Sequence, residues 1–237
     1  MAEAKAGILI PARMGSKRLP GKPLQMAGDR PLLARTWEAA RTSVEARKAS
    51  AACVVTDSRE IEAFCDRERI PCHYHDCECR TGSDRIAAAL ERMPGWNDVE
   101  LIVNLQCDEP DLTGEDLDLL IRGTRGQPYV GTIICTAPPP GGVLNDCNAV
   151  KAMVDARDFA LYFSRLDLPS GLLHVGAYCY PRRRLEDFTA WASPPMERAE
   201  KLEQLRLLYF GVPVRCFRID RPVRSVNCRE DLERFVE

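Results

Sequence analysis

The sequence lacks several features that would place it in whole classes of protein. No apolar run approaches the roughly 20 residues needed to cross a bilayer, and the first residues turn charged without a signal-peptide core. Neither sign of charge dominates: 33 Lys and Arg stand against 35 Asp and Glu, for a net charge of -2. Because nucleic-acid binders usually carry a strongly basic surface, we expect no nucleic-acid partner. The missing apolar run and the missing signal-peptide core predict no membrane partner and a cytoplasmic location.

A C-x-x-C pair is also absent, although the chain has 11 cysteines. An odd number of cysteines without an export signal favours free thiols, many of them serving as small core residues. The one dense group is the segment 73–79, which reads His-Tyr-His-Asp-Cys-Glu-Cys. No second cluster of ligands accompanies this segment, so the sequence disfavours a structural zinc site there.

The best-known phosphate-binding signatures are missing too, since neither G-x-x-x-x-G-K-[ST] nor G-x-G-x-x-G is present. Instead, a buried strand is predicted at Gly7–Ile10, and a loop with two glycines, Gly15 and Gly21, follows it. The loop carries four cations, Arg13, Lys17, Arg18 and Lys22. Glycines let backbone N–H groups approach a polyphosphate, and cations offset its charge. A solvated basic loop is the plainer alternative, but four cations in so short a segment favour a phosphate site.

Strands alternate with helices through the first half of the chain. Buried strands are predicted at 7–10, 51–55 and 100–106, and helices at 31–42, 59–69, 81–93 and 113–122. Ser58, Ser83 and Thr113 are the expected N-caps of the last three helices. Further strands are predicted at 130–136, 149–154, 171–180 and 214–219, with one more helix over 195–210. This order predicts an α/β fold with three α/β/α layers and a mostly parallel, Rossmann-like sheet, in one domain over residues 1–237.

Polar clusters follow three of the predicted strands, at 13–22, 56–57 and 106–108. Because ligands of open parallel sheets bind beyond the carboxyl ends of the strands, we expect these clusters to converge. Asp108 suits Mg²⁺, which prefers carboxylate and phosphate oxygens and takes few carboxylates from the protein. The alternative for Asp108 is a side chain that caps the turn before Pro110.

Nine segments resemble the sugar-acid cytidylyltransferases, and among them the CMP-KDO synthetases (3-deoxy-manno-octulosonate cytidylyltransferases). They are IPARMGSKRLPGKPL at 10–24, VTD at 55–57, TGSDR at 81–85, VNLQCDEP at 103–110, NAVK at 148–151, ALYFSR at 160–165, HVGAY at 174–178, EKLEQLR at 200–206 and VNCREDL at 226–232. The segments keep the family's order across nearly the whole chain. The likeness is therefore far more specific than one glycine-rich loop would be.

The resemblance implies a nucleotidyltransferase fold, a homodimer, and an enzyme that transfers CMP from CTP to an acidic acceptor with release of pyrophosphate. The CTP-binding residues that it implies are Pro11, Ala12, Arg13, Arg18, Lys22, Thr81, Ser83, Arg85 and Gln106. Arg13, Lys22 and Asp108 would be catalytic, with Asp108 and Asn227 as ligands of a Mg²⁺ cofactor.

The acceptor residues implied by the resemblance are Arg165, His174, Tyr178, Glu203 and Gln204. A solvated helix face is the plainer alternative for 203–206, and a hydrogen-bonded core histidine for His174.

Three departures from the family pattern bear on the acceptor. Cys107 replaces a glycine beside Asp108, Asn227 replaces the second metal-binding aspartate, and only four residues separate Pro169 from His174. In KDO synthetases, as the resemblance implies, a longer segment between these two positions helps to cover the sugar acid. A shorter segment, together with the loss of one negative charge at the metal site, favours a small, highly charged acceptor, so the sequence predicts a phosphonate such as phosphonoformate. The alternatives are KDO itself, a non-catalytic nucleotide-binding paralogue, and a uridylyl- or guanylyltransferase.

Overall fold

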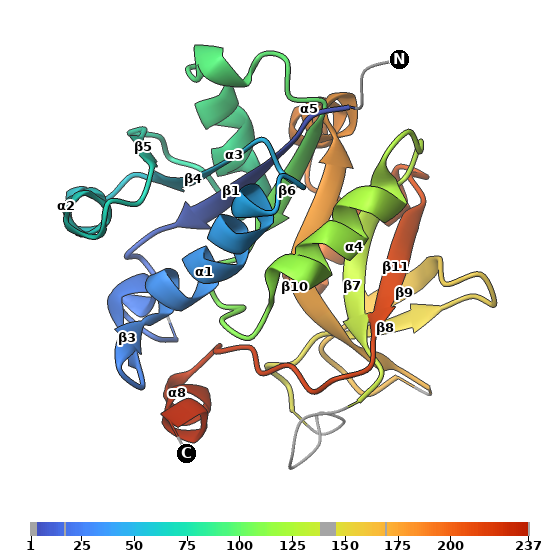
Figure 1. Ribbon diagram of the computed structural model, residues 1–237. Coiled ribbons are helices and arrows are strands. Elements are labelled where there is room, and N and C mark those ends of the chain that lie inside the picture. Colours follow the sequence, from blue (N-terminus) through green and yellow to red (C-terminus); the bar gives the residue numbers. More distant parts are fainter. Residues whose placement is uncertain (1–3, 17, 138–145, 169, 237) are drawn as a thin grey trace.

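The computed structural model describes residues 4–16, 18–137, 146–168 and 170–236, so Lys17 and Pro169 lie outside it. A nine-stranded sheet forms its centre, in the order β11-β7-β10-β6-β1-β4-β5, and β8 pairs with both β10 and β9 (Figure 1). Its strands are β1 (Ala6–Ala12), β4 (Ala51–Thr56), β5 (Cys72–Tyr74), β6 (Leu101–Leu105), β7 (Val130–Cys135), β8 (Lys151–Val154), β9 (Ala160–Ser164), β10 (Leu172–Pro181) and β11 (Val214–Ile219). A separate two-stranded sheet joins β2 (Met26–Ala27) to β3 (Arg30–Pro31).

The directions of the strands confirm the predicted α/β fold. β1 runs parallel to β4 and β6, β5 parallel to β4, and β11 parallel to β7. β10 lies between β6 and β7 and is antiparallel to both. This insertion was not predicted, because a buried apolar run looks the same in either direction.

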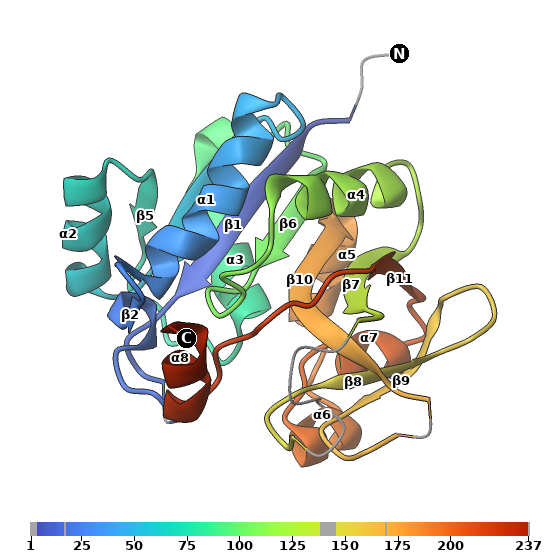
Figure 2. The ribbon, with the colours of Figure 1, turned by 60° about the horizontal axis from the view of Figure 1, so that its bottom comes forward.

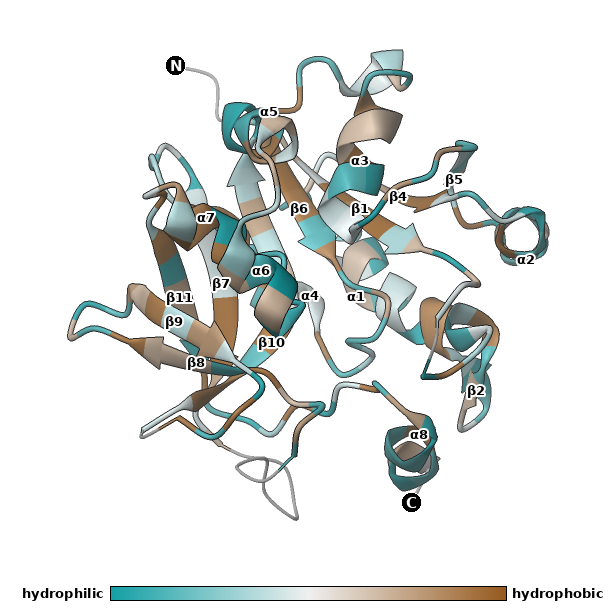
Figure 3. Cartoon of the chain, turned by 180° about the vertical axis from the view of Figure 1, so that it is seen from behind, coloured by the Kyte–Doolittle hydropathy of each residue, from teal (hydrophilic) through white to brown (hydrophobic). Residues whose placement is uncertain are grey.

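Helices cover both faces of the sheet. Figure 1 shows α1 (Leu32–Glu45) and α4 (Gly114–Thr124) in front of the strands. The view from behind shows four helices on the opposite face of the sheet, namely α3 (Gly82–Leu90), α5 (Arg182–Ala190), α6 (Pro195–Glu200) and α7 (Leu205–Tyr209) (Figure 3). The remaining helical elements are α2 (Arg59–Glu68), α8 (Arg229–Val236) and the 3₁₀ turns η1 (Lys22–Leu24) and η2 (Pro94–Trp96). Within the described ranges, no helix is long and apolar enough to cross a membrane.

The sheet separates two hydrophobic cores. Along β1, Ile8 and Ile10 pack into the core that also contains Leu33 of α1, whereas Leu9 packs into the opposite core with Ile86 of α3. All five side chains are fully buried. Successive side chains of a strand point to opposite faces, so an uninterrupted apolar run is what a strand covered on both sides requires.

Two helix predictions were wrong in detail. α3 is capped by Thr81 rather than Ser83, because Thr81 Oγ1 accepts from Asp84 N at 3.1 Å and the Asp84 carboxylate accepts from Thr81 N at 3.2 Å. The predicted helix 195–210 is split into α6 and α7 by Lys201, whose φ of 57° is left-handed. The caps Ser58 and Thr113 are confirmed.

The expectation that all cysteines are free was also wrong. Cys77 and Cys79 form a disulfide, with Cα atoms 5.6 Å apart, while the other nine cysteines are free. The pair lies in residues 75–80, between β5 and α3, where the backbone belongs to no helix or strand. Because this segment is not held in a strand, its backbone can turn between the two cysteines. The Cys79 amide donates to the Cys77 carbonyl at 3.0 Å within this turn.

Candidate active site

A cavity of about 1410 Å³ collects the polar clusters that follow β1 and β6. Its lining comes from widely separated parts of the sequence, including the loop after β1, the start of α3, β10, the segment between α6 and α7, and the segment after β11. The predicted site residues that line it are Pro11, Ala12, Arg13, Arg18, Lys22, Thr81, Arg85, Gln106, Asp108, Arg165, His174, Tyr178, Glu203, Gln204 and Asn227. The fold thus brings the clusters at 13–22 and 106–108 into one space, as the strand-end argument predicted, whereas Asp57 of the third cluster lines a smaller adjoining hollow instead.

Ser83 alone among the predicted site residues does not line the cavity. Its buried hydroxyl donates to Glu203 Oε1 at 3.2 Å and accepts from Asn104 Nδ2 at 3.1 Å. Glu203 itself lines the cavity, so Ser83 acts on the site by holding this carboxylate.

The cationic loop is tied to the opposite side of the cavity by two side chains. Arg18 Nη1 donates to Asn148 Oδ1 at 2.7 Å, and Lys22 Nζ donates to Asp108 Oδ2 at 2.6 Å. Gly21 takes a left-handed φ of 66°, which glycine adopts without steric cost, and its amide donates to the Met14 carbonyl at 3.2 Å. Arg13 is exposed at the cavity wall. The loop therefore presents cations at a turn that the backbone holds in place.

Asp108 and the segment carrying Asn227 lie together. The Val226 amide donates to the Asp108 carbonyl at 2.9 Å, and both Asp108 and Asn227 line the cavity. After β11 the chain crosses the molecule to reach α8 beside β2, which brings Asn227 to this position (Figure 2). Among the residues that the structure describes, no group of three or more His, Cys, Asp and Glu side chains could hold a metal by itself.

A buried carboxylate that was not predicted, Glu109, joins three chain segments at the cavity wall. Its Oε1 accepts from the Gly176 amide at 2.8 Å, and its Oε2 accepts from Ser225 Oγ at 2.6 Å. Burial, with the charge of Asp108 as the second cause, raises the pKa of Glu109 to about 8. The sequence did show a carboxylate after a buried strand, between Asp108 and Pro110. Its role could not be predicted, however, because its two partners lie 67 and 116 residues away.

Gly176 is where β10 comes closest to this loop. A Cβ on Gly176 would lie 2.7 Å from Gln106 Oε1 and 2.8 Å from Glu109 Oε1, so a side chain here would have to displace both of these groups. The register of β10 against β7 shifts between Val175 and Tyr178, which includes this position. The glycine therefore allows the antiparallel strand to pack directly against the loop that bears Asp108.

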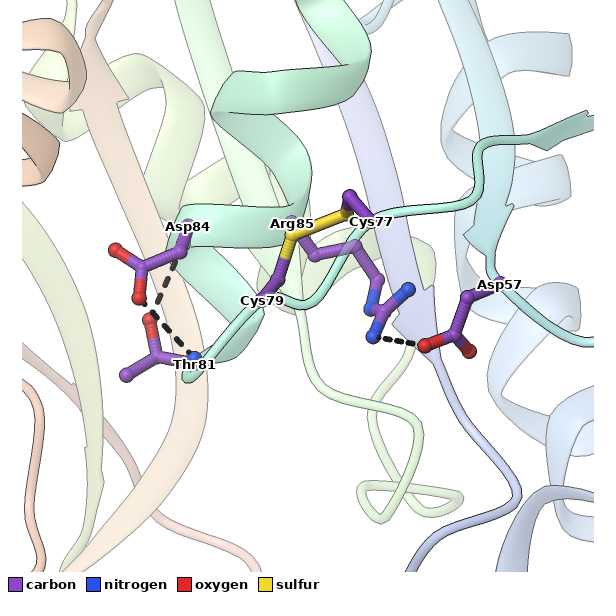
Figure 4. Close-up of a disulfide and its surroundings, with 6 residues drawn as sticks. All are labelled: Asp57, Cys77, Cys79, Thr81, Asp84 and Arg85. Atoms are coloured by element: carbon purple, nitrogen blue, oxygen red, sulfur yellow. Dashed lines mark hydrogen bonds and ion pairs between the residues drawn. A yellow bond between two sulfur atoms is a disulfide. The ribbon is translucent and has the colours of Figure 1, made fainter.

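Arg85 supplies a buried donor at the start of α3. Its Nη2 donates to Asp57 Oδ2 at 2.6 Å, whereas its buried Nη1 has no hydrogen-bond partner among the residues that the structure describes (Figure 4). The side chain is 3% exposed and lines the cavity. Because a buried unpaired donor is costly, this nitrogen is poised for an acceptor that a ligand would bring.

The residues predicted for the acceptor are mostly buried. Gln204 is 3% exposed and Glu203 is bonded to Ser83, so the alternative of a solvated helix face is wrong for 203–206. Arg165 Nη1 donates to the Asn148 carbonyl at 2.7 Å, and burial lowers the pKa of Arg165. Tyr178 is 1% exposed, and burial raises the pKa of its hydroxyl well above the ordinary value.

His174 is both hydrogen-bonded in the core and part of the cavity wall. Its Nε2 lies 2.9 Å from Thr132 Oγ1, and its ring meets Phe163 edge-on. Burial, with the nearby charge of Arg165, lowers the pKa of His174 to about 3. The imidazole is therefore neutral at physiological pH.

This shift predicts a loss of stability in acid. The unfolded chain takes up a proton at His174 as the pH falls through about 6.5, whereas the native chain does so only near 3. Between pH 7 and pH 5 this site should lower the free energy of unfolding by about 2 kcal/mol, an effect absent from His174→Gln. Urea unfolding of both proteins at the two pH values measures the difference, and equal pH dependence would contradict the assignment.

Comparisons with known proteins agree with this geometry. Residues 7–216 match the cytidylyltransferase family. The chain is 36% identical over 240 residues to a 3-deoxy-manno-octulosonate cytidylyltransferase of Bdellovibrio bacteriovorus, an alignment covering 96% of this chain and 94% of the relative. A Chlorobium phaeobacteroides protein of the same name is also 36% identical, with 97% and 95% covered.

Solved structures extend the likeness. A CMP:2-keto-3-deoxy-manno-octonic acid synthetase complexed with CTP superposes with a TM-score of 0.84 at 30% identity, covering 98% of this chain and 96% of that one. A 4-diphosphocytidyl-2C-methyl-D-erythritol synthase from Anaerococcus prevotii, at 12% identity and a TM-score of 0.65 over 98% and 97% of the two chains, shares the fold alone. The resemblance seen in the sequence is thus confirmed, and the chain belongs to the cytidylyltransferase family, as a nucleotidyltransferase that uses CTP.

Proposed function

We propose that the protein transfers CMP from CTP to 3-deoxy-manno-octulosonate, releasing pyrophosphate. The observation that carries the proposal is full-length similarity, at 36% identity, to relatives that bear this acceptor's name. The similarity favours the sugar acid over the small phosphonate predicted from Asn227 and the short 169–174 link. The cavity, at about 1410 Å³, is large enough for a nucleotide and a sugar acid together.

The proposed reaction follows from where the charges lie. The triphosphate of CTP would lie against Arg13, Arg18 and Lys22, whose cations offset the charge that develops on the α-phosphate and the leaving pyrophosphate. Arg85 Nη1, which is unpaired within the described part of the chain, would donate to the cytosine. An acceptor oxygen attacks the α-phosphorus in line, and no covalent intermediate with the protein is needed.

The residues present fit a magnesium ion. Asp108 offers a carboxylate that is 21% exposed, and Asn227 offers an amide oxygen in the same cavity. These are hard oxygen donors, and one or two protein ligands suffice when substrate phosphates supply the others. Bound there, Mg²⁺ would neutralise phosphate charge and orient the triphosphate. Lys22, now paired with Asp108, would then be released towards the phosphates.

Asn227 should limit the affinity for this ion. Asn227→Asp is expected to tighten Mg²⁺ binding by about tenfold or more, because affinity for hard cations rises with the ligands' charge. Titration calorimetry with Mg²⁺ and a non-hydrolysable CTP analogue measures the change. Asn97→Asp, which adds the same charge at the C-cap of η2, outside the cavity lining, is the control. An equal gain in both variants would show that position 227 is not a ligand.

The acceptor is tested by supplying several acids with CTP and Mg²⁺. Pyrophosphate release and the mass of the CMP conjugate are measured with 3-deoxy-manno-octulosonate, N-acetylneuraminate and phosphonoformate. We expect the first to give the highest kcat/KM. A higher value with phosphonoformate would favour the prediction made from Asn227, and no release with any acid would favour the non-catalytic alternative. Parallel assays with UTP and GTP test the choice of nucleotide.

A further inference from the structure

The Cys77–Cys79 disulfide lies beside the part of the cavity to which we assign the nucleotide. The pair lines a second hollow, of about 660 Å³, together with Arg13 and Gly15 of the cationic loop and with Arg85. Arg13, Gly15, Arg80 and Arg85 line the main cavity as well, so the two spaces share a wall. The disulfide is therefore part of the surroundings of the predicted nucleotide residues.

The sulfur atoms lie between two contacts that position α3. Figure 4 shows the disulfide between the Thr81–Asp84 capping box and the Arg85–Asp57 ion pair. Only Arg80 separates Cys79 from the cap residue Thr81. Residues 77–79 are thus linked through a single residue to the first turn of α3, which presents Arg85 to the cavity.

The position of the disulfide suits a local role better than a contribution to global stability. The bond closes a ring of only three residues, and short loops remove less conformational entropy from the unfolded chain than long ones. Both cysteines are half-buried, and their neighbours Asp76, Glu78 and Arg80 are exposed, so a small thiol can reach the sulfurs.

We propose that Cys77 and Cys79 form a thiol–disulfide exchange site that takes a small dithiol and sets the affinity for CTP. A thiolate of the dithiol attacks one cysteine sulfur, breaks the S–S bond and releases the other cysteine as a thiolate, which takes up a proton. The second thiol of the dithiol loses its proton and attacks its own sulfur of the mixed disulfide, which releases the remaining protein cysteine as a thiolate that takes up a proton. Two electrons and two protons pass to the protein, which gains two thiols, while the dithiol becomes a disulfide.

Reduction should weaken nucleotide binding. Without the bond, residues 75–80 gain conformational freedom that must be lost again when Thr81 and Arg85 meet the nucleotide. This step rests on the proposed placement of CTP against Arg13 and Arg85. We expect the Kd for CTP to rise about three- to tenfold on reduction, as is usual when a preorganised segment is loosened.

The test measures thiols and nucleotide affinity on the same full-length samples. The protein is oxidised with diamide or reduced with dithiothreitol. One portion of each sample is alkylated with N-ethylmaleimide and analysed by mass spectrometry, and the other portion is titrated with CTP by calorimetry. Cys77 and Cys79 should be labelled only after reduction, and the reduced protein should bind CTP more weakly. The double variant Cys77→Ser/Cys79→Ser should match the reduced protein in both conditions, with little change in Tm. Cys72→Ser, at a free cysteine of β5 that lines neither hollow, should keep the difference between the two states.

Two results would overturn the inference alone: labelling of both cysteines after oxidation, or equal CTP affinity in protein whose disulfide is shown to be formed and then reduced. Absence of CTP binding in both states would overturn the proposed function and this inference together. A third result would have the same effect as the first two: a double variant that still responds to dithiothreitol would assign the response to other cysteines and overturn the inference.

Discussion

Replacement of Asp108 by alanine is expected to lower kcat by about 10²- to 10⁴-fold while the protein remains folded. The carboxylate is the single acidic ligand that we assign to Mg²⁺, and charge stabilisation by such an ion contributes several kcal/mol, with each 1.36 kcal/mol equal to a factor of ten. The group that loses its ion-pair partner is the Lys22 ammonium, and because Lys22 and Asp108 both line the cavity, water there can solvate the freed charge, so the fold should persist. Pyrophosphate release at saturating CTP measures the effect.

The matched control for this variant is Asp98→Ala. Asp98 precedes β6, whereas Asp108 follows it, and Asp98 is 63% exposed in an ion pair with Lys5. The control should retain wild-type kcat. Circular dichroism and thermal unfolding of both variants separate loss of chemistry from loss of structure. Near-normal turnover in Asp108→Ala would remove this carboxylate from the mechanism and return it to a turn-capping role before Pro110.

Of the substitutions described, Arg206→Met should lower the free energy of unfolding the most. Arg206 is fully buried, and its Nε and Nη2 donate to the two carboxylate oxygens of Glu197 at 2.8 and 2.6 Å. Its Nη1 donates to the Phe188 carbonyl at 3.1 Å and lies 3.6 Å from Asp84 in the capping box of α3. Removing one partner of a buried pair leaves the other charge without compensation, at a cost of about 3–5 kcal/mol.

Urea unfolding of a set of variants isolates this cost. The double variant Arg206→Met/Glu197→Leu removes both charges, so part of the stability should return. Arg229→Met removes an arginine that is 79% exposed in its pair with Glu233, and it should change the midpoint little. If Arg206→Met were no less stable than Arg229→Met, the buried ion pair would not support the fold.

The parts of the fold that could be predicted are those fixed by neighbouring residues. The apolar runs of β1, β4 and β6 identified buried strands because each side chain alternates between two covered faces. Thr113 could be predicted as a cap because threonine is favoured at that position, and its partner in the structure, Asp116, is only three residues away. The misassigned cap of α3 shows the limit of such reasoning: Thr81 and Ser83 are both good caps, and Asp84 decides between them by bonding to Thr81.

Features that depend on distant residues could not be predicted. The split at Lys201 falls where a pattern of ordinary helix formers continues, and no glycine marks the left-handed residue. From sequence, Glu109 is recognisable only as the residue after Asp108. Its hydrogen bonds to Gly176 of β10 and to Ser225 of the last segment exist only in the folded chain. The cationic loop was found from sequence, whereas its partners Asn148 and Asp108 depended on the fold.

The crossing segment after β11 has a consequence for the order in which the enzyme is made. Chains are synthesised from the N-terminus, and earlier parts fold first. β1, β4, β6 and β10 can pair, with the cationic loop and Asp108 already beside one another, before residue 226 has left the ribosome. The hydrogen bond from Val226 to Asp108 forms only afterwards. A nascent chain that has folded this far already holds the cationic loop and Asp108 together, and Asn227 joins them only when the last segment of the chain has been made.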